Sequence, residues 1–395
     1  MKALLQETRG PIKTVQMEPR NDLALLQYTG GTTGIPKGAM LTHYNLIVNT
    51  EQVRAWEALQ PGEIHLAVLP LFHIFGMTMA MNSPISMKST MIMLPDPRDI
   101  PSIIEAIERY CPAIFCAVPT MYISIINTPD IEKHNLRSLK LCISGGSALP
   151  LEVQRKFEAQ TGGRLIEGFG LTETSPVTHM NPLDDPQKNR PGCIGIPVSD
   201  TQAKIVDLET GEHDLPSGEA GELVIRGPQV MLGYWHNPDD NRVAVRGGWF
   251  HTGDIATMDV DGYFRIIDRK KDMIDVSGYK VWPREVEEIL FEHPAVREAA
   301  VVGMPDERSG EVVKAFVVLK KGSEGKVTAE ELSKFCKDRI ASFKAPKFIE
   351  FKDALPKTAV GKVLRRELNG RQSKGLQMAS ESRGRRERPN SKVMR

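Results

Sequence analysis

The stretch YTGGTTGIPKGAM, residues 28–40, is rich in glycine and threonine and poor in side chains that can pack. It lies between an apolar run, LALLQ at 23–27, and an amphipathic run that begins near His43. Glycine loses more backbone entropy on folding than any other residue, so an ordered segment of this composition needs a compensating interaction. A bound phosphate would supply this interaction. Glycine lets backbone N–H groups approach the anion closely, threonine hydroxyls add hydrogen-bond donors, and Lys37 adds a positive charge. A flexible surface loop is the alternative interpretation.

Outward from this loop, short apolar runs alternate with helical patterns. This alternation predicts an α/β fold with a mostly parallel, doubly wound sheet. The expected strands are 23–28, 64–69, 90–94, 113–118 and 139–143, and the expected helices are 43–59, 99–110 and 150–160. The glycine-rich loop would then lie between a strand and a helix, where open α/β sheets bind ligands. That position favours the phosphate-binding interpretation.

The pattern changes after Pro191, where helical signals become rare. Strand-like segments separated by Gly, Pro and Asp turns predict a small antiparallel or barrel-like β unit, at 203–207, 222–226 and 264–267. The charge cluster at 268–272 is interpreted as a hinge. Beyond it, a small α+β domain is expected, with helices 284–292 and 329–340 and strands 296–303, 312–319 and 347–351.

These patterns together predict the domain organisation. We expect an irregular N-terminus over 1–22, a large domain over 23–270, a small mobile α+β domain over 271–368 and a disordered basic tail over 369–395. A chain of 395 residues is also longer than one hydrophobic core usually serves, which agrees with more than one domain.

Composition excludes several classes of protein. Hydrophobic residues make up 41%, charged residues 26% and the net charge is +1, so the chain as a whole indicates no nucleic-acid or membrane-surface partner. Only the tail after Leu368 is basic, and no aromatic residue interleaves its arginines, so it predicts no specific nucleic-acid binding. No apolar run of about 18 residues suggests a membrane span, although peripheral contact stays open. The 5 scattered cysteines, without a CxxC, indicate reduced thiols in a cytoplasmic protein.

The loop sequence GTTGIPKG, residues 31–38, lacks the GxxxxGK[ST] pattern of a Walker A loop. It resembles the nucleotide loop of adenylate-forming enzymes, the family of acyl-CoA synthetases, luciferases and peptide-synthetase adenylation domains. Five further stretches follow in that family's order: ISGGSALP at 143–150, EGFGLTETS at 167–175, the long GWFHTGD…DRKKDMI motif at 248–274, VSGYKVWPREVEEIL at 276–290 and LPKTAVGKVLRREL at 355–368. The chain is most similar to the long-chain fatty acid–CoA ligases.

This resemblance implies a reaction in two halves. ATP and a fatty acid carboxylate would give an acyl-adenylate and pyrophosphate, and coenzyme A would then displace AMP. It implies ATP and Mg²⁺ as cofactors and coenzyme A as cosubstrate. Two alternatives stay open, a truncated non-catalytic adenylate-binding protein and an adenylation enzyme for another carboxylate such as an amino or aryl acid.

By the same resemblance, Lys362, Thr172 and Glu173 are the expected catalytic residues. Lys362 would bridge the acyl carboxylate and the α-phosphate, as a point charge on a flexible stem can. Glu173 would hold Mg²⁺, because bringing two anions together requires neutralising charge. The residues expected to bind ATP or AMP are Thr29, Gly30, Gly31, Thr32, Thr33, Gly34, Lys37, Gly145, Gly146, Ser147, Phe169, Gly170, Asp254 and Arg269. Among them, Phe169 would stack near adenine and Asp254 would bind the ribose hydroxyls.

Three further roles are implied. Lys271 matches the hinge about which the C-terminal domain would rotate between the half-reactions. The loop of Ser277, Gly278 and Tyr279 would enter the site for thioester formation on the coenzyme A side. His73 would lie near the acyl pocket, although a lone histidine beside an apolar stretch is more often a core residue.

The chain also departs from the family pattern. Only 22 residues precede Leu23, where the family has a substantial segment, so we expect a chain truncated at its N-terminal side with an exposed sheet edge. Asp275 is a second departure, because a carboxylate near the coenzyme A path would not favour an anionic cosubstrate. Acyl chain length and oligomeric state cannot be derived from these patterns.

Overall fold

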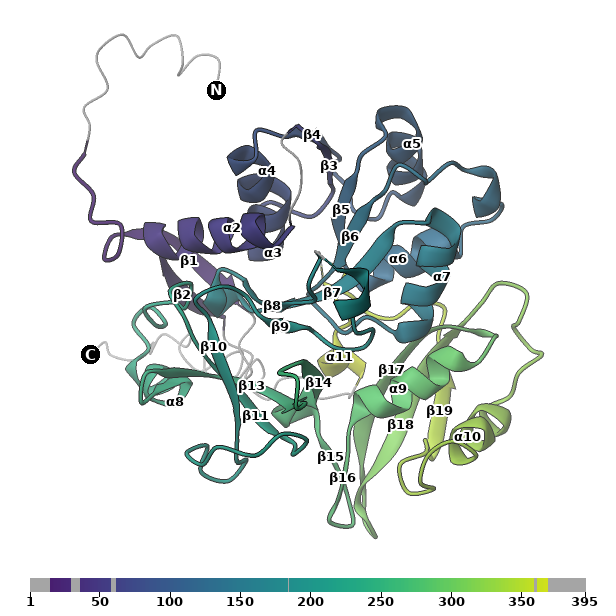
Figure 1. The fold of residues 1–395 in the computed structure, drawn as a ribbon. Helices are drawn as coiled ribbons and strands as arrows, with labels where there is room; N and C mark the ends of the chain where they lie inside the picture. Colours follow the sequence, from purple (N-terminus) through teal and green to yellow (C-terminus); the bar gives the residue numbers. More distant parts are fainter. Residues whose placement is uncertain (1–14, 30–35, 58–61, 184, 359–360, 369–395) are drawn as a thin grey trace, which may run out of the picture.

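A seven-stranded sheet organises the N-terminal half of the chain in the computed structural model, which describes residues 15–29, 36–57, 62–183, 185–358 and 361–368 (Figure 1). Its strand order is β4-β3-β5-β6-β7-β8-β9. The strands from β4 to β7 in that order pair in parallel, and β8 and β9 add in antiparallel fashion. The bounds are β3 (Ile64–Ala67), β4 (Thr90–Met93), β5 (Ile114–Ala117), β6 (Leu141–Ser144), β7 (Arg164–Gly170), β8 (Val177–Met180) and β9 (Ile196–Pro197). The predicted α/β class is confirmed.

Helices cover this sheet on both faces. Strands β5 and β6 are buried at every residue, which is typical of parallel strands between two helical layers. The helices are α2 (His43–Glu57), α3 (Ile74–Met77), α4 (Ser83–Ser86), α5 (Ile100–Tyr110), α6 (Pro119–Ile126) and α7 (Leu151–Thr161), and a π-helical turn, Thr78–Asn82, joins α3 to α4. In the core, the Tyr122 ring packs edge-on between Phe115 and Phe157, and its hydroxyl donates to two strand carbonyls. The core is thus built on α6, which the sequence pattern did not predict.

The glycine-rich loop has different neighbours from those expected. Strand β1 (Leu23–Thr29) pairs antiparallel with β2 (Lys37–Thr42), with Thr29 opposite Lys37, and together they form a separate two-stranded sheet. The prediction that the loop joins a strand of the parallel sheet directly to a helix was therefore wrong. The alternating exposure along β1 is the physical reason, because one-sided burial is typical of antiparallel ribbons and not of a buried parallel strand. Residues 30–35 lie outside the described residues.

The predicted antiparallel unit is present as a second sheet. It comprises β10 (Gln202–Val206), β11 (Gly221–Arg226), β12 (Val245–Arg246), β13 (Trp249–Met258) and β14 (Phe264–Arg269). All of its pairs are antiparallel. Strand β13 was not predicted, since its sequence WFHTGDIATM mixes polar and apolar residues without a regular period. Helix α8 (Pro238–Ala244) precedes β12 and connects this unit to the β1–β2 ribbon.

The C-terminal unit has the predicted α+β composition. A five-stranded sheet with the order β16-β15-β18-β17, to which β19 adds beside β18, packs with two helices. The elements are β15 (Ile274–Val276), β16 (Tyr279–Val281), α9 (Pro283–Glu292), β17 (Val296–Asp306), β18 (Gly310–Leu319), α10 (Ala329–Lys337), β19 (Phe348–Phe351) and α11 (Arg365–Leu368). Thr328 caps α10, because its hydroxyl accepts a hydrogen bond from the Glu331 N–H. In Figure 1, α11 returns toward the N-terminal sheet, whereas β15 and β16 form a hairpin at the opposite end.

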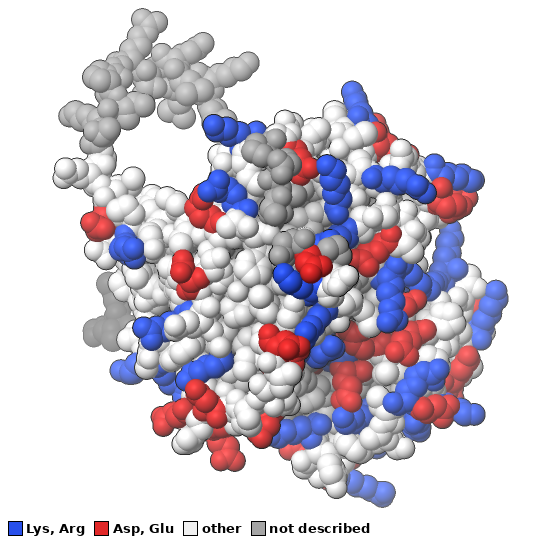
Figure 2. Space-filling view, in the orientation of Figure 1, with Lys and Arg blue, Asp and Glu red and all other residues white. Residues whose placement is uncertain are grey.

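The surface carries both signs of charge. Lys, Arg, Asp and Glu side chains are interspersed on the face in Figure 2, most densely over the C-terminal unit, which fits a net charge of +1. Within the described residues, no helix is both long and apolar enough to cross a membrane. The 5 cysteines all lie in the described residues and form no disulfide, and Cys111 alone among them is exposed.

Candidate functional site

Asp254 and Arg269 face each other on neighbouring strands. They are register partners on β13 and β14, and Arg269 Nε donates to Asp254 Oδ1 at 3.1 Å. The second oxygen, Oδ2, is buried and has no hydrogen-bond partner among the described residues. Burial raises the pKa of Asp254, against the nearby charges of Arg269 and Lys362. A buried carboxylate oxygen without a partner is costly, so this geometry leaves one acceptor available for an external donor such as a hydroxyl.

Lys362 reaches the same place from the C-terminal unit. Its loop is docked on the first turn of α6, where Thr120 Oγ1 donates to the Gly361 carbonyl at 3.0 Å. Gly361 has φ +85°, and a Cβ there would lie 2.8 Å from Thr120 Oγ1, so the close approach requires glycine. The Arg269 guanidinium, followed by burial, lowers the pKa of Lys362 to about 7. A shift of this kind indicates several cations held together in a partly buried space.

His73 lies close enough to be affected by the same lysine. Burial, followed by the charge of Lys362, lowers the pKa of His73. The ring also has a structural task, because Nδ1 accepts a hydrogen bond from the Phe75 N–H at 3.2 Å and thereby caps α3. The structure therefore places His73 beside the cluster while one ring nitrogen is already in use.

Glu173 also lies close enough to this cluster for its charge to act on Arg269. It lies in the short 3₁₀ turn Thr172–Thr174 after β7 and is 8% exposed. Its Oε1 accepts from the Tyr234 hydroxyl at 2.7 Å, and its charge helps to raise the pKa of Arg269, to which Asp254 contributes most. Thr172, the residue before it, is half-buried.

Tyr234 also links Glu173 to the lysine of the glycine-rich segment. Lys37 Nζ lies 5.3 Å from the centroid of the Tyr234 ring and pairs with Asp240 Oδ1 at 2.6 Å. Tyr234 is thus placed between the two predicted phosphate-side residues. Sequence reasoning missed Tyr234 and Asp240. The only signal was a tyrosine after glycine in LGYWHNPDD, which has no spacing that points to Glu173 61 residues away.

Glycines lie at or just after the carboxyl ends of β6 and β7, which pair in parallel. At the first, a Cβ on Gly145 would lie 3.0 Å from the Phe75 ring, and Gly146 has φ +81°. Ser147 ends this turn and is half-buried. At the second, Phe169 is half-buried, and a Cβ on Gly170 would lie 2.2 Å from the Pro176 carbonyl oxygen. The backbone therefore approaches its neighbours closely at the edge where open α/β sheets bind ligands.

Other predicted residues are not brought into this cluster. Ser277, Gly278 and Tyr279 are exposed in the turn of the β15–β16 hairpin, at the end of the C-terminal unit remote from β7 (Figure 1). Asp275 has a local explanation, since its Oδ1 accepts from the Gly278 N–H at 2.6 Å and shapes that turn.

Of the remaining predicted residues, the structure describes Lys271 and Thr29. Lys271 is exposed over the residue as a whole, but its ammonium group is partly desolvated, and this desolvation, followed by the charge of Arg269, lowers its pKa. Thr29 ends β1 and is half-buried. The predicted residues Gly30, Gly31, Thr32, Thr33 and Gly34 lie outside the described residues.

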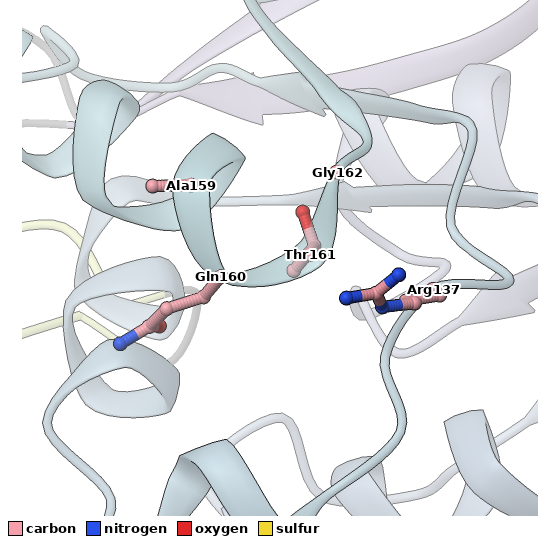
Figure 3. Close-up of a pocket in the computed structure, with 5 residues that line it drawn as sticks. All are labelled: Arg137, Ala159, Gln160, Thr161 and Gly162. Atoms are coloured by element: carbon pink, nitrogen blue, oxygen red, sulfur yellow. The ribbon is translucent and has the colours of Figure 1, made fainter.

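A separate hollow lies at the C-terminal end of α7 (Figure 3). It measures about 350 Å³ and is lined by Arg137, Ala159, Gln160, Thr161 and Gly162, none of which is a predicted site residue. The Thr161 hydroxyl already donates to the Phe157 carbonyl and accepts from the Gly163 N–H. We therefore take the cluster of charged residues around Asp254 as the candidate site, because the predicted residues gather there and not in this hollow.

Comparison with known proteins gives a consistent result. The sequence profile described as AMP-binding enzyme matches residues 2–235, and that described as AMP-binding enzyme C-terminal domain matches residues 285–362. A long-chain-fatty-acid–CoA ligase of Bacillus subtilis is 48% identical over 367 residues, 92% of this chain and 64% of the relative. One of Escherichia coli O6:H1 is 45% identical over 350 residues, 88% of this chain and 61% of the relative. The chain thus spans a little under two thirds of these relatives.

Solved structures agree in fold. The ATP-bound structure of MatB from Rhodopseudomonas palustris superposes with a TM-score of 0.85 at 32% identity, over 93% of this chain and 71% of that one. The apo structure of the same protein, over the same shares of both chains, gives 0.72. The arrangement described above is therefore more similar to the ATP-bound form than to the apo form.

Proposed function

Because this chain belongs to the AMP-binding enzyme family, we propose that it activates a long-chain fatty acid with ATP and transfers the acyl group to coenzyme A. In the first half-reaction, a carboxylate oxygen attacks the α-phosphorus of ATP, the bond to the β-phosphate breaks and pyrophosphate leaves. In the second, the coenzyme A thiolate attacks the acyl carbonyl carbon and AMP leaves. The enzyme is therefore proposed to be an acid–thiol ligase.

One observation carries this proposal: Lys362, Arg269 and Asp254 converge, and one oxygen of the Asp254 carboxylate has no hydrogen-bond partner among the described residues. The free Oδ2 of Asp254 suits a ribose hydroxyl, and its partner Arg269 holds the carboxylate in one orientation. Lys362, drawn into the same space, is placed to stabilise negative charge at the α-phosphate during attack. Fixed cations of this kind stabilise the transition state without reorganising at the moment of reaction.

The donor set also fits Mg²⁺ in the way this ion is usually bound with nucleotides. No group of three or more His, Cys, Asp or Glu side chains that could enclose a metal occurs in the part of the chain that the structure describes. Mg²⁺ is commonly held by one or two carboxylates together with substrate phosphates, so Glu173 would hold it and Tyr234 would orient that carboxylate. When bound, the ion neutralises phosphate charge.

The proposal includes a movement of the C-terminal unit about Lys271. With Lys362 in the site, the Ser277–Tyr279 turn is remote from it, so one arrangement cannot serve both half-reactions (Figure 1). We assign residues 23–270 to the large domain and 271–368 to the moving domain. The cysteine pattern favours a cytoplasmic location, and this stays a prediction.

The experiment that tests this function is ATP–pyrophosphate exchange on the chain, with carboxylates from acetate to stearate and a few aryl and amino acids. We expect exchange with fatty acids, strongest with a long chain. Exchange with aryl or amino acids only would replace the proposed substrate class. A folded sample that shows no exchange with any acid would favour a non-catalytic adenylate-binding protein.

The Tyr234→Phe substitution removes only the hydroxyl that donates to Glu173. Because partners of metal-binding side chains commonly change metal affinity by about 10-fold or more, we expect the Mg²⁺ concentration for half-maximal exchange to rise about 10-fold. Titration of Mg²⁺ at saturating ATP measures this. Tyr263→Phe is the control, since that hydroxyl bonds the Lys188 carbonyl away from the site. An unchanged Mg²⁺ concentration for half-maximal exchange would show that Tyr234 does not influence metal binding.

The pH dependence follows from Lys362. Its charged form is the one that stabilises phosphate, and its pKa in the free enzyme is lowered to about 7. The charged fraction therefore falls as pH rises through 7, and kcat/KM for ATP, which reports the free enzyme, should decline above that pH. Lys362→Arg should shift the decline to higher pH even if overall activity is low. A profile that rises through pH 7 and stays high to pH 9 would contradict this assignment.

The Gly278→Leu substitution tests the second half-reaction. Gly278 has φ +84°, a conformation that side-chain-bearing residues adopt poorly, and nothing lies within 4 Å of an added Cβ in the present arrangement. We therefore expect thioester formation to fall by at least about 10-fold while pyrophosphate exchange stays near its original rate. Single-turnover measurements with and without coenzyme A separate the two. Equal losses in both would indicate a general folding defect.

A further inference from the structure

Arg284 crosses the boundary between the two parts of the molecule. It lies in the first turn of α9, and its side chain is 11% exposed. One guanidinium nitrogen lies 3.4 Å from Glu167 Oε2, on strand β7 of the large sheet, and the other donates to the Ile266 carbonyl at 2.9 Å. The Glu167 side chain is only 7% exposed. A buried charged pair therefore joins α9 to the strand that also carries Phe169.

A carboxylate of the same helix also reaches from the C-terminal unit across this boundary. Glu288, one turn after Arg284, lies 3.8 Å from the Arg284 Nε, and its Oε2 accepts from the Leu151 N–H at 3.4 Å. Leu151 is the first residue of α7 in the large sheet's helical layer. Burial raises the pKa of Glu288, against the charge of Arg284. Arg284 is thus held between one carboxylate from each side.

The same helix is tied to the loop of Lys362. Arg365, three residues after Lys362, makes two hydrogen bonds to Glu287 of α9, at 2.7 and 2.8 Å. Its other guanidinium nitrogen lies 3.5 Å from Asp272 in the hinge segment. Arg284, Glu287 and Glu288 all lie on α9. Because Glu287 holds Arg365, a rotation of α9 would also move the segment that carries Lys362. The orientation of α9 against β7 therefore sets whether Lys362 reaches the site.

We propose that Arg284, paired with Glu167, is a positioning residue that holds the C-terminal unit with Lys362 in the site and must release Glu167 before the Ser277–Tyr279 turn can enter. This inference rests on the proposed function. Removing Glu167 would leave the buried Arg284 with Glu288 of its own helix, 3.8 Å away, as its remaining carboxylate, and would remove the ion pair that crosses the boundary. When the interface is open, both groups are solvated, so the loss of Glu167 destabilises only the closed arrangement and shifts the population toward the open one.

The experiment compares Glu167→Gln with the unchanged chain by measuring the distance between two spin labels in the presence of ATP. Native Cys111 is the exposed thiol of the large domain, and Lys321→Cys supplies the second label on an exposed loop of the C-terminal unit. We expect a dominant closed distance in the unchanged chain and a shift of the closed-to-open ratio by at least about 10-fold in Glu167→Gln. Glu285→Gln is the control, because Glu285 lies on α9 but pairs with Lys344 inside the C-terminal unit.

The rates of the two half-reactions provide a second measurement. If Glu167 were needed only for folding, its loss would lower both rates together. Glu167→Gln should slow pyrophosphate exchange and leave thioester formation from supplied acyl-adenylate unchanged or faster. The double variant Arg284→Gln/Glu167→Gln should exchange pyrophosphate no more slowly than either single variant. An unaltered label distance, or equal losses in both half-reactions, would overturn the proposal. The distance measurement needs no turnover, so it can support Arg284 positioning even if no acid gives exchange.

Discussion

Lys362→Ala is expected to lower the rate of acyl-adenylate formation by about 10²–10³-fold, the usual loss when one group that stabilises transition-state charge is removed. The ammonium group is held beside Arg269 and Asp254, where its lowered pKa reports crowding by other cations. That crowding disfavours the charged lysine until an anion arrives. The α-phosphate supplies such an anion, so the attraction should be greatest where negative charge develops.

Pyrophosphate exchange at saturating ATP and fatty acid measures this effect. Lys357→Ala is a matched control, because Lys357 lies in the same segment but pairs with Glu298 at 2.7 Å within the C-terminal unit. Thioester formation from supplied acyl-adenylate should persist in Lys362→Ala. Full exchange in Lys362→Ala would remove this lysine from the first half-reaction.

Asp254→Asn is expected to weaken ATP binding by about 10²-fold. Hydrogen bonds to a charged group contribute about 1.5–3 kcal/mol, and the amide would replace one acceptor oxygen with a donor facing the ribose. The same change also removes the negative charge that pairs with Arg269 at 3.1 Å and leaves a neutral acceptor, so the orientation of that guanidinium should be less fixed.

Calorimetric titration with ATP measures the dissociation constant without turnover. Asp259→Asn is the control, since Asp259 lies just after the same strand and pairs with Arg190 near the surface. A discriminating variation replaces ATP with its 2′,3′-dideoxy analogue. The unchanged chain should bind the analogue more weakly than it binds ATP. The Asp254→Asn chain, already weakened, should bind ATP and the analogue with similar affinities. An equal preference for ATP over the analogue in both proteins would contradict the ribose assignment.

The sequence predicted much of the fold because hydrophobic periodicity reports local structure. Strands β5 and β6 and helices α5, α7, α9 and α10 lie within a few residues of their predicted ranges. The β1–β2 ribbon was misassigned, because the pairing of Thr29 with Lys37 depends on a partner strand that no local pattern specifies. Strand β13 was missed, since its side chains are placed by neighbours on both sides and not by alternation.

The candidate site was also predicted only in part from the sequence. Motifs selected Asp254, Arg269, Glu173 and Lys362, and the structure brings these four into one electrostatic neighbourhood. Motifs could not indicate the contacts of Tyr234, Asp240 or Arg284, because each contact joins residues that are far apart in sequence. The direct pairing of Asp254 with Arg269 also depends on the register of β13 against β14, which an irregularity beside Ile255 adjusts.

The most direct test of the central claim is one turnover with a long-chain fatty acid, ATP and Mg²⁺ in the absence of coenzyme A, with the protein in excess over ATP. The account predicts release of pyrophosphate and a protein-bound acyl-adenylate identified by its mass. Addition of coenzyme A should then convert that intermediate to acyl-CoA and AMP. Folded protein that binds ATP but releases no pyrophosphate would contradict the account, because Lys362, Arg269 and Asp254 would then form a nucleotide site without adenylation chemistry.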